Sequence, residues 1–227
     1  AGVACTFRVS GLFLIGALAV LAVVGDGDKR RPTSRAARRS RITDVVNRLS
    51  ILLVPTAVLA AFVVWLHRLT GSWTAWSRAQ TKGWGRGFTT PVETLRHTLP
   101  ATHAEAWQST YGAGAMGVAI MFRLELVSVA VGILVFLYCL IRCRWASASW
   151  VGIQVVAFSI GYWYMSVNRA TLLWFPLFVA LGEASRGPSK PPGLVLLWRG
   201  IMGIIVAVDL AVMVWWGWRF FTGGWAS

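Results

Sequence analysis

The stretch from Ser166 to Glu183 reads SVNRATLLWFPLFVALGE, and the organisation of the chain follows from it. A short polar tip, Ser166 to Arg169, separates two apolar segments. A charged side chain at a hydrocarbon boundary is costly unless it reaches the headgroups or a partner. Arg169 is therefore either an anchor at a helix end or part of a functional site. Pro176 has no backbone N–H and would kink a helix at this point.

The composition indicates an integral membrane protein. Of the 227 residues, 56% are hydrophobic and 13% are charged, whereas soluble domains carry about a quarter of charged residues. The net charge of +14 could suggest nucleic-acid binding. Much of that charge, however, lies in one block between two apolar segments, which membrane topology explains and which has no interleaved aromatic residues. We therefore expect no nucleic-acid partner.

Six apolar segments are long enough, alone or with their neighbours, to be read as membrane spans: 10–24, 48–66, 124–141, 148–167, 171–184 and 194–218. About 20 helical residues cross the hydrocarbon core. The fold class predicted is all-α, a polytopic transmembrane helical bundle that forms a single integral membrane domain over residues 1–227. The short connections at 26–47, 142–147 and 185–193 carry Arg or Lys and are predicted to be cytoplasmic. Pro55 is expected to kink the second span.

The long stretch 68–123 is then an extracytoplasmic loop. Trp73 and Trp76 are three residues apart, which predicts a short helix over 72–80 lying at the membrane interface. Pro91 is expected at the first position of another helix. The small apolar run 112–121 is either a re-entrant piece or the outer extension of the next span.

No soluble catalytic motif is present: there is no phosphate-binding glycine loop, no HExxH and no nucleophile elbow. Three cysteines (Cys5, Cys139 and Cys143) show no disulfide or zinc spacing, so we expect buried free thiols and no metal or other cofactor. On the predicted outer face, cationic side chains can gather: Arg8, Arg78, Lys82, Arg86 and Arg169. Guanidinium groups bind phosphate through paired hydrogen bonds, so this group suits a phosphate or pyrophosphate lipid headgroup.

Three motifs add a family resemblance. Arg169 to Leu181 reads R-x-x-L-x-x-F-P-L-F-x-A-L, Thr70 to Pro91 carries A-x-x-x-A-Q followed by W-x-R-x-F-x-x-P, and Thr6 to Gly11 reads TFRVSG. Their order, spacing and predicted side of the membrane resemble the PIG-V-type mannosyltransferases, which are membrane glycosyltransferases of the GT-C superfamily. In the third motif, Phe7 separates the threonine from the arginine, which departs from the family's T-R-x-x-G.

The resemblance implies a transferase that moves a sugar from a polyprenyl-phosphate donor to a lipid-linked acceptor on the extracytoplasmic face. It implies that membrane lipids surround the chain, and the Ala, Arg, Gly and Trp bias suggests a bacterial plasma membrane. Arg8 and Arg169 would stabilise the departing lipid phosphate. Trp84 and Trp76 could stack on a sugar ring or support the loop. The substrate-binding residues expected are Arg8, Gln80, Trp84, Arg86 and Arg169.

The catalytic aspartate of that family would precede Ala1, so we expect an incomplete enzyme and assign no catalytic residue. Candidate bases within the chain are each more simply read as structural or solvated groups: Glu93, Glu105, His97, His103 and Asp209. Two alternatives remain. One is a non-catalytic membrane protein that handles lipid or assists assembly. The other is a small transporter, for which Asp209 is taken as the one clear charge near the midplane.

Overall fold

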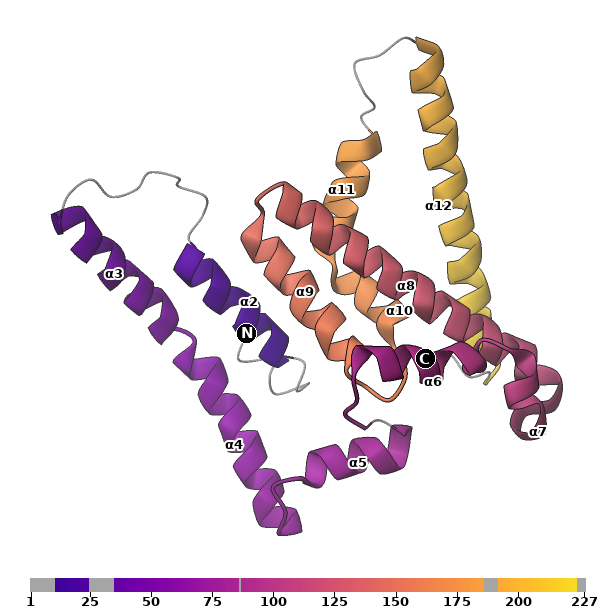
Figure 1. Cartoon of the computed structure of the whole chain (residues 1–227), viewed down its shortest axis with the longest axis horizontal. Helices are drawn as coiled ribbons and strands as arrows, with labels where there is room; N and C mark the ends of the chain where they lie inside the picture. Colours follow the sequence, from indigo (N-terminus) through magenta and orange to yellow (C-terminus); the bar gives the residue numbers. More distant parts are fainter. Residues whose placement is uncertain (1–10, 25–34, 86, 186–191, 224–227) are drawn as a thin grey trace. The chain divides into compact units, whose positions relative to one another are not determined.

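A computed structural model describes residues 11–24, 35–85, 87–185 and 192–223 of the chain (Figure 1). Every regular element in these ranges is helical, which confirms the all-α prediction. The chain divides into two compact units, one formed by 1–94 with 132–163 and the other by 95–131 with 164–227. Helices α6 (Pro91–Ala101) and α8 (Ala115–Ile141) each contribute residues to both units.

In the first unit, the first described helix packs against the last one. Helix α2 (Gly11–Val24) lies beside α9 (Trp145–Ser159) (Figure 1). A β-carbon built on Gly16 would stand 3.0 Å from Cδ1 of Ile153, so the absence of a side chain at Gly16 permits the close approach. The other helices of this unit are α3 (Arg35–Ser50), α4 (Leu53–Thr70) and α5 (Ala75–Trp84).

Pro55 interrupts the second predicted span, as expected. The proline has no N–H, so the carbonyl of Ile51 has no donor four residues later, and helix α3 ends at Ser50. The N–H of Leu52 turns back to the carbonyl of Leu49 at 2.9 Å, and α4 resumes at Leu53. The basic segment 26–47 is also more regular than a loop, because α3 covers it from Arg35 onward.

A tight cap joins α8 to α9. The N–H of Arg144 donates to the carbonyl of Cys139 at 2.8 Å, and the N–H of Cys143 donates to Leu140 at 2.9 Å. This pair of bonds is the Schellman arrangement, which needs a residue in the left-handed region. Cys143 takes that place with a φ of 54°. Helix α9 then returns close to α8, where a β-carbon on Gly152 would meet the ring of Phe136 at 2.8 Å.

The second unit is built around the first half of α8. Its buried side chains include Val118, Met121 and Phe122, and the Trp107 ring stacks on Phe122 with centroids 5.3 Å apart. The indole N–H of Trp107 donates to the carbonyl of Ala101 at 2.8 Å. The remaining elements are η1 (Ala104–Trp107), α7 (Gln108–Tyr111), η2 (Gly112–Gly114), α10 (Val167–Ala170), η3 (Thr171–Leu173), α11 (Phe175–Ser185) and α12 (Pro192–Phe221).

The stretch 68–123 has several of the local features that were predicted for it. It contains short helices, and α6 begins at Pro91 as expected. The hydroxyl of Thr90 accepts the N–H of Glu93 at 3.3 Å, so Thr90 acts as the N-cap residue of α6. Most of the run 112–121 extends the following apolar helix toward its N-terminus, because α8 starts at Ala115. A helix was expected over 72–80, and α5 forms there with its start three residues later than expected.

Three helical stretches are long and apolar enough to cross a membrane: Ile42–Thr70, Ala104–Ile141 and Gly193–Phe221. They correspond to the second, third and sixth predicted spans and are compatible with an integral membrane protein. The other three predicted spans form shorter helices. The 14 residues of α2, 15 of α9 and 11 of α11 rise about 21, 22 and 16 Å, less than the roughly 30 Å of a hydrocarbon core.

Two local expectations are wrong. The fourth predicted span, 148–167, is not helical throughout, because α9 ends at Ser159 and the backbone continues without helix to Ser166. Pro176 does not kink a helix. It is the second residue of α11, within the first turn, where its missing N–H would have no partner in any case.

The close packing of Gly152 on Phe136 predicts a destabilised Gly152→Ala variant. The added methyl must displace the ring, and overpacking costs about 1–3 kcal/mol, against a gain of about 0.5–1 kcal/mol from replacing a helical glycine. Gly83→Ala on α5 is the matched control, because its β-carbon meets nothing within 4 Å. We expect the melting temperature in detergent, measured by circular dichroism, to fall for Gly152→Ala and not for Gly83→Ala. Equal melting temperatures for the two variants would contradict the packing.

Candidate functional site

A buried carboxylate holds the polar tip. Glu125 on α8 is 0% exposed. Its Oε1 accepts the N–H of Ser166 at 2.9 Å, and its Oε2 accepts the N–H groups of Val167 at 2.7 Å and Asn168 at 3.1 Å. One side chain thus satisfies three consecutive backbone donors. All of these residues belong to the second unit.

The local backbone explains why an anion fits here. Ser166 has a φ of 66° and lies in the left-handed region, while Val167 begins the short helix α10. A left-handed residue followed by helical residues turns successive N–H groups toward one point and forms an anion-binding nest. The first N–H groups of a helix also have no acceptor within the helix. Glu125 supplies the acceptors and a negative charge at the positive end of α10.

A second bond joins the same two segments. Ser128 lies three residues after Glu125, on the same face of α8, and its hydroxyl donates to Oδ1 of Asn168 at 2.7 Å. The hydroxyl of Thr171 donates to the backbone carbonyl of Asn168 at 2.6 Å. The position of Asn168 is therefore fixed through both its backbone and its side chain. Its Nδ2 is buried without a hydrogen-bond partner in the described part of the chain.

Threonine side chains on α6 satisfy the non-helical backbone before the tip. In the second unit, the hydroxyl of Thr98 accepts the N–H of Tyr164 at 3.0 Å. In the first unit, the hydroxyl of Thr94 lies 2.8 Å from the carbonyl oxygen of Ser159 and 2.5 Å from that of Gly161. Both threonines are 0% exposed. Side chains of α6 therefore supply partners for backbone groups at the end of α9 and in the non-helical segment that follows it.

Arg169 follows directly after the clamped residues. It lies in α10, and its side chain is exposed, whereas its neighbours Val167 and Ala170 are buried. A four-residue helix would not hold its shape alone. The bonds to Glu125 and Ser128 fix the backbone from which the guanidinium projects. Among the predicted substrate-binding residues, Arg169 is the one for which the described structure explains how the backbone is held while the side chain is exposed.

The other predicted site residues lie elsewhere or outside the described ranges. Gln80 lies on α5 and is half-buried, and Trp84 is the last residue of that helix. Both belong to the first unit, and Arg169 belongs to the second. Arg8 and Arg86 lie outside the described residues. The expected convergence of these five side chains on one cavity remains a prediction.

The candidate bases are spread over several elements. Glu93 and His97 lie half-buried on α6, and Glu105 and His103 are exposed at η1. Asp209 is exposed on α12. Among the residues that the structure describes, no three His, Cys, Asp or Glu side chains are grouped to hold a metal ion. Cys139 is a free buried thiol as expected, but Cys143 is free and exposed because it forms the turn after α8.

Sequence reasoning missed Glu125. It lies within the predicted span 124–141, so the sequence contains a signal: an acidic residue inside an apolar segment is rare and needs a partner. Asp209 was therefore not the only acidic residue within a predicted span. The partner groups of Glu125 are backbone N–H groups 41 to 43 positions away, which no local pattern reveals.

Comparison of the chain with family models, with curated proteins and with solved structures gives no match. The resemblance to the PIG-V-type mannosyltransferases therefore rests on the three sequence motifs. The structure shows how the backbone before one of these motifs is held. The arginine that opens the Arg169–Leu181 motif follows a backbone segment that a buried carboxylate holds in place.

Removing the carboxylate should release the tip. Glu125→Ala removes the acceptor of one buried and two part-buried N–H groups, and an unpaired buried group costs about 1–3 kcal/mol. We expect amide hydrogen exchange at residues 166–168 to accelerate by at least about tenfold relative to the core of α8. Ser128→Ala is the matched control, because it removes the bond to Asn168 and keeps the three N–H bonds. An unchanged exchange rate at 166–168 in Glu125→Ala would show that the Glu125 carboxylate does not hold the tip.

Proposed function

We propose that the chain is the membrane-embedded part of a glycosyltransferase. It would transfer a mannose-type sugar from a polyprenyl-phosphate donor to a lipid-linked acceptor on the extracytoplasmic face. The observation that carries the proposal is the exposed Arg169 guanidinium on a backbone fixed by Glu125. Positioning a charge in advance favours binding, because less conformational entropy is lost when the ligand arrives.

The proposed topology has six spans in a bacterial plasma membrane. It uses the three long apolar helices and, in addition, α2, α9 and α11 with their flanking residues. The segment 26–47 and the turn containing Arg142 would face the cytoplasm, since short basic connections stay on that side. The segment 68–123 and Arg169 would then face outward. Non-helical backbone near a membrane requires internal hydrogen-bond partners, and Glu125, Thr94 and Thr98 provide such partners between α9 and α10.

In this proposal Arg169 binds the lipid phosphate of the donor. A guanidinium can form two parallel hydrogen bonds to phosphate oxygens, and its charge would stabilise the phosphate as the sugar leaves. Gln80, Trp84, Arg86 and Arg8 would contact the donor from the outer loop and the first span. The sugar transfer also needs a base to accept the proton of the acceptor hydroxyl. We assign that role to no residue of this chain.

A non-catalytic membrane protein is the second candidate, and two observations favour it. The carboxylate of Glu125 is occupied by three N–H donors, which makes it a structural group rather than an acid–base catalyst. The apolar window of α12 is 0% buried, and such a surface is open to lipid or to a partner helix. Such a protein would handle lipid or assist the assembly of a membrane complex.

Phosphate binding by Arg169 is tested with the chain in lipid nanodiscs and a polyprenyl phosphate. Arg169→Ala should weaken binding by at least about tenfold, because a charge-assisted hydrogen bond contributes about 1.5–3 kcal/mol. The affinity of Arg169→Lys should lie between those of the unaltered chain and of Arg169→Ala. Lysine keeps the charge but cannot form the two parallel hydrogen bonds. The matching polyprenol without phosphate should bind equally to all three proteins.

Arg142→Ala is the matched control, because Arg142 is also exposed but lies in the turn after α8. Equal loss of binding in Arg142→Ala and Arg169→Ala would indicate a general charge effect and contradict the assignment. Transfer of labelled sugar from the donor into membrane lipid then separates the two candidates. Binding with Arg169 dependence but without transfer would favour the non-catalytic protein.

A further inference from the structure

An acidic side chain lies near the middle of the last apolar helix. The candidate span in α12 runs from Gly193 to Phe221, so Asp209 is two positions from its centre, or about 3 Å along the axis. The flanking residues are apolar over several turns, from Ile204 to Val214. Asp209 is exposed, and the apolar window of this span is 0% buried. This carboxyl group therefore lies deep within the apolar length of the helix.

Within the described part of the chain, Asp209 has neither a hydrogen bond nor an ion pair. The nearest basic residues on α12 are Arg199 and Arg219, each ten positions away. Ten residues of helix correspond to about 15 Å, which is too far for a direct bond between side chains. Pairing on one helix needs a spacing of three or four residues. The charge of Asp209 is therefore not compensated by its own helix.

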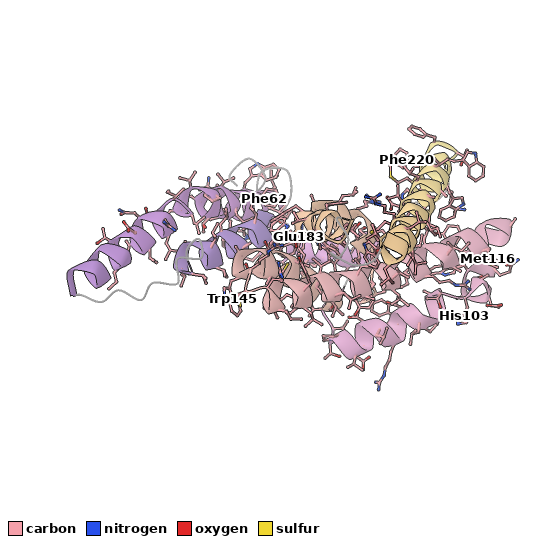
Figure 2. The ribbon with its side chains drawn as sticks, turned by 90° about the horizontal axis from the view of Figure 1, so that it is seen from above. Phe62, His103, Met116, Trp145, Glu183 and Phe220 are labelled. Carbon is pink, nitrogen blue, oxygen red and sulfur yellow. The ribbon has the colours of Figure 1, made fainter. Side chains whose placement is uncertain are left out.

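Helix α12 contacts its own unit near its two ends. Near the start, the indole N–H of Trp198 donates to the carbonyl of Ala184 at the end of α11. Near the other end, the guanidinium of Arg219 lies against Gly117 of α8, where a β-carbon would have no room, and over the ring of Trp215 at 5.6 Å. Aromatic side chains surround the Phe220 end of this helix (Figure 2).

Asp209 shares the face of α12 that carries the first of these contacts. It is eleven positions after Trp198, about three full turns, so the two side chains point in nearly the same direction. Within the second unit, the middle of this face is exposed, although residues near both ends of the helix contact that unit. A lipid chain could cover the apolar residues there, but it has no group that binds a carboxylate. The helix therefore needs a partner with a polar or cationic group.

We propose that the middle of α12 binds a transmembrane helix of another protein, which presents a lysine or arginine at the depth of Asp209. Complementarity selects this partner, because a carboxyl group in hydrocarbon is stabilised by a cationic side chain on a facing helix. A second copy of α12 in the same orientation would place Asp209 against Asp209 and would supply no cation. The proposal rests on α12 alone and does not depend on sugar transfer or phosphate binding.

The test uses the full chain in lipid vesicles, with a fluorescent donor at its C-terminus. The probe is a synthetic leucine–alanine transmembrane peptide of about 20 residues, with an acceptor label and one lysine at its midpoint. A second peptide has leucine in place of that lysine. We expect energy transfer to show that the lysine peptide binds about fivefold more tightly, which is the range of interhelical polar bonds in membranes. In the Asp209→Leu variant, the lysine peptide should bind no more tightly than the leucine peptide.

Asp44→Leu is the matched control, because Asp44 is also exposed but lies on α3, and this change should leave the preference for lysine intact. Equal binding of the two peptides to the unaltered chain would overturn the proposal, as would a lysine preference that persists in Asp209→Leu. Self-association of the chain that depends on Asp209, without a lysine preference, would identify a second copy as the occupant and would also overturn it.

Discussion

The bond set between the Glu125 carboxylate and the N–H groups of Ser166, Val167 and Asn168 is the constraint on which the second unit depends. The chain leaves regular helix after Ser159 in a protein with long apolar helices. Backbone donors that lose their helical partners in such surroundings need other acceptors, or each costs several kcal/mol. A buried carboxylate meets this need for three donors at once, and the nearby α10 dipole stabilises its charge in return.

Presentation of Arg169 is a consequence of this constraint. The residue before it, Asn168, is held by its backbone to Glu125 and by its side chain to Ser128. The residue after it, Ala170, is buried. The backbone of Arg169 therefore lies between two fixed neighbours, while its side chain is exposed. Among the described residues, Asp209 has no such support, which is why we propose a partner helix for it.

Local rules recovered much of the helix pattern from the sequence. Apolar length predicted the helices that became α4, α8 and α12, and backbone chemistry predicted the break near Pro55 and the helix start at Pro91. The same reasoning failed at Pro176, where a kink was expected and a helix start is found. It also missed Glu125, because the acceptor and its donors are more than forty positions apart. Helix propensity and hydrophobic periodicity describe residues that are close in sequence, whereas the bonds of Glu125 join segments that are far apart in it.

The most direct measurement is the side of the membrane on which position 169 can be modified. In a chain with Cys5, Cys139 and Cys143 replaced by serine, Arg169→Cys is treated in intact cells with a membrane-impermeant maleimide. We expect modification from outside, with the additional change Glu125→Ala altering its rate because the tip is released. Modification only after the cytoplasmic side is opened would contradict an extracytoplasmic tip. A rate that is unaffected by Glu125→Ala would contradict control of the tip by the buried carboxylate.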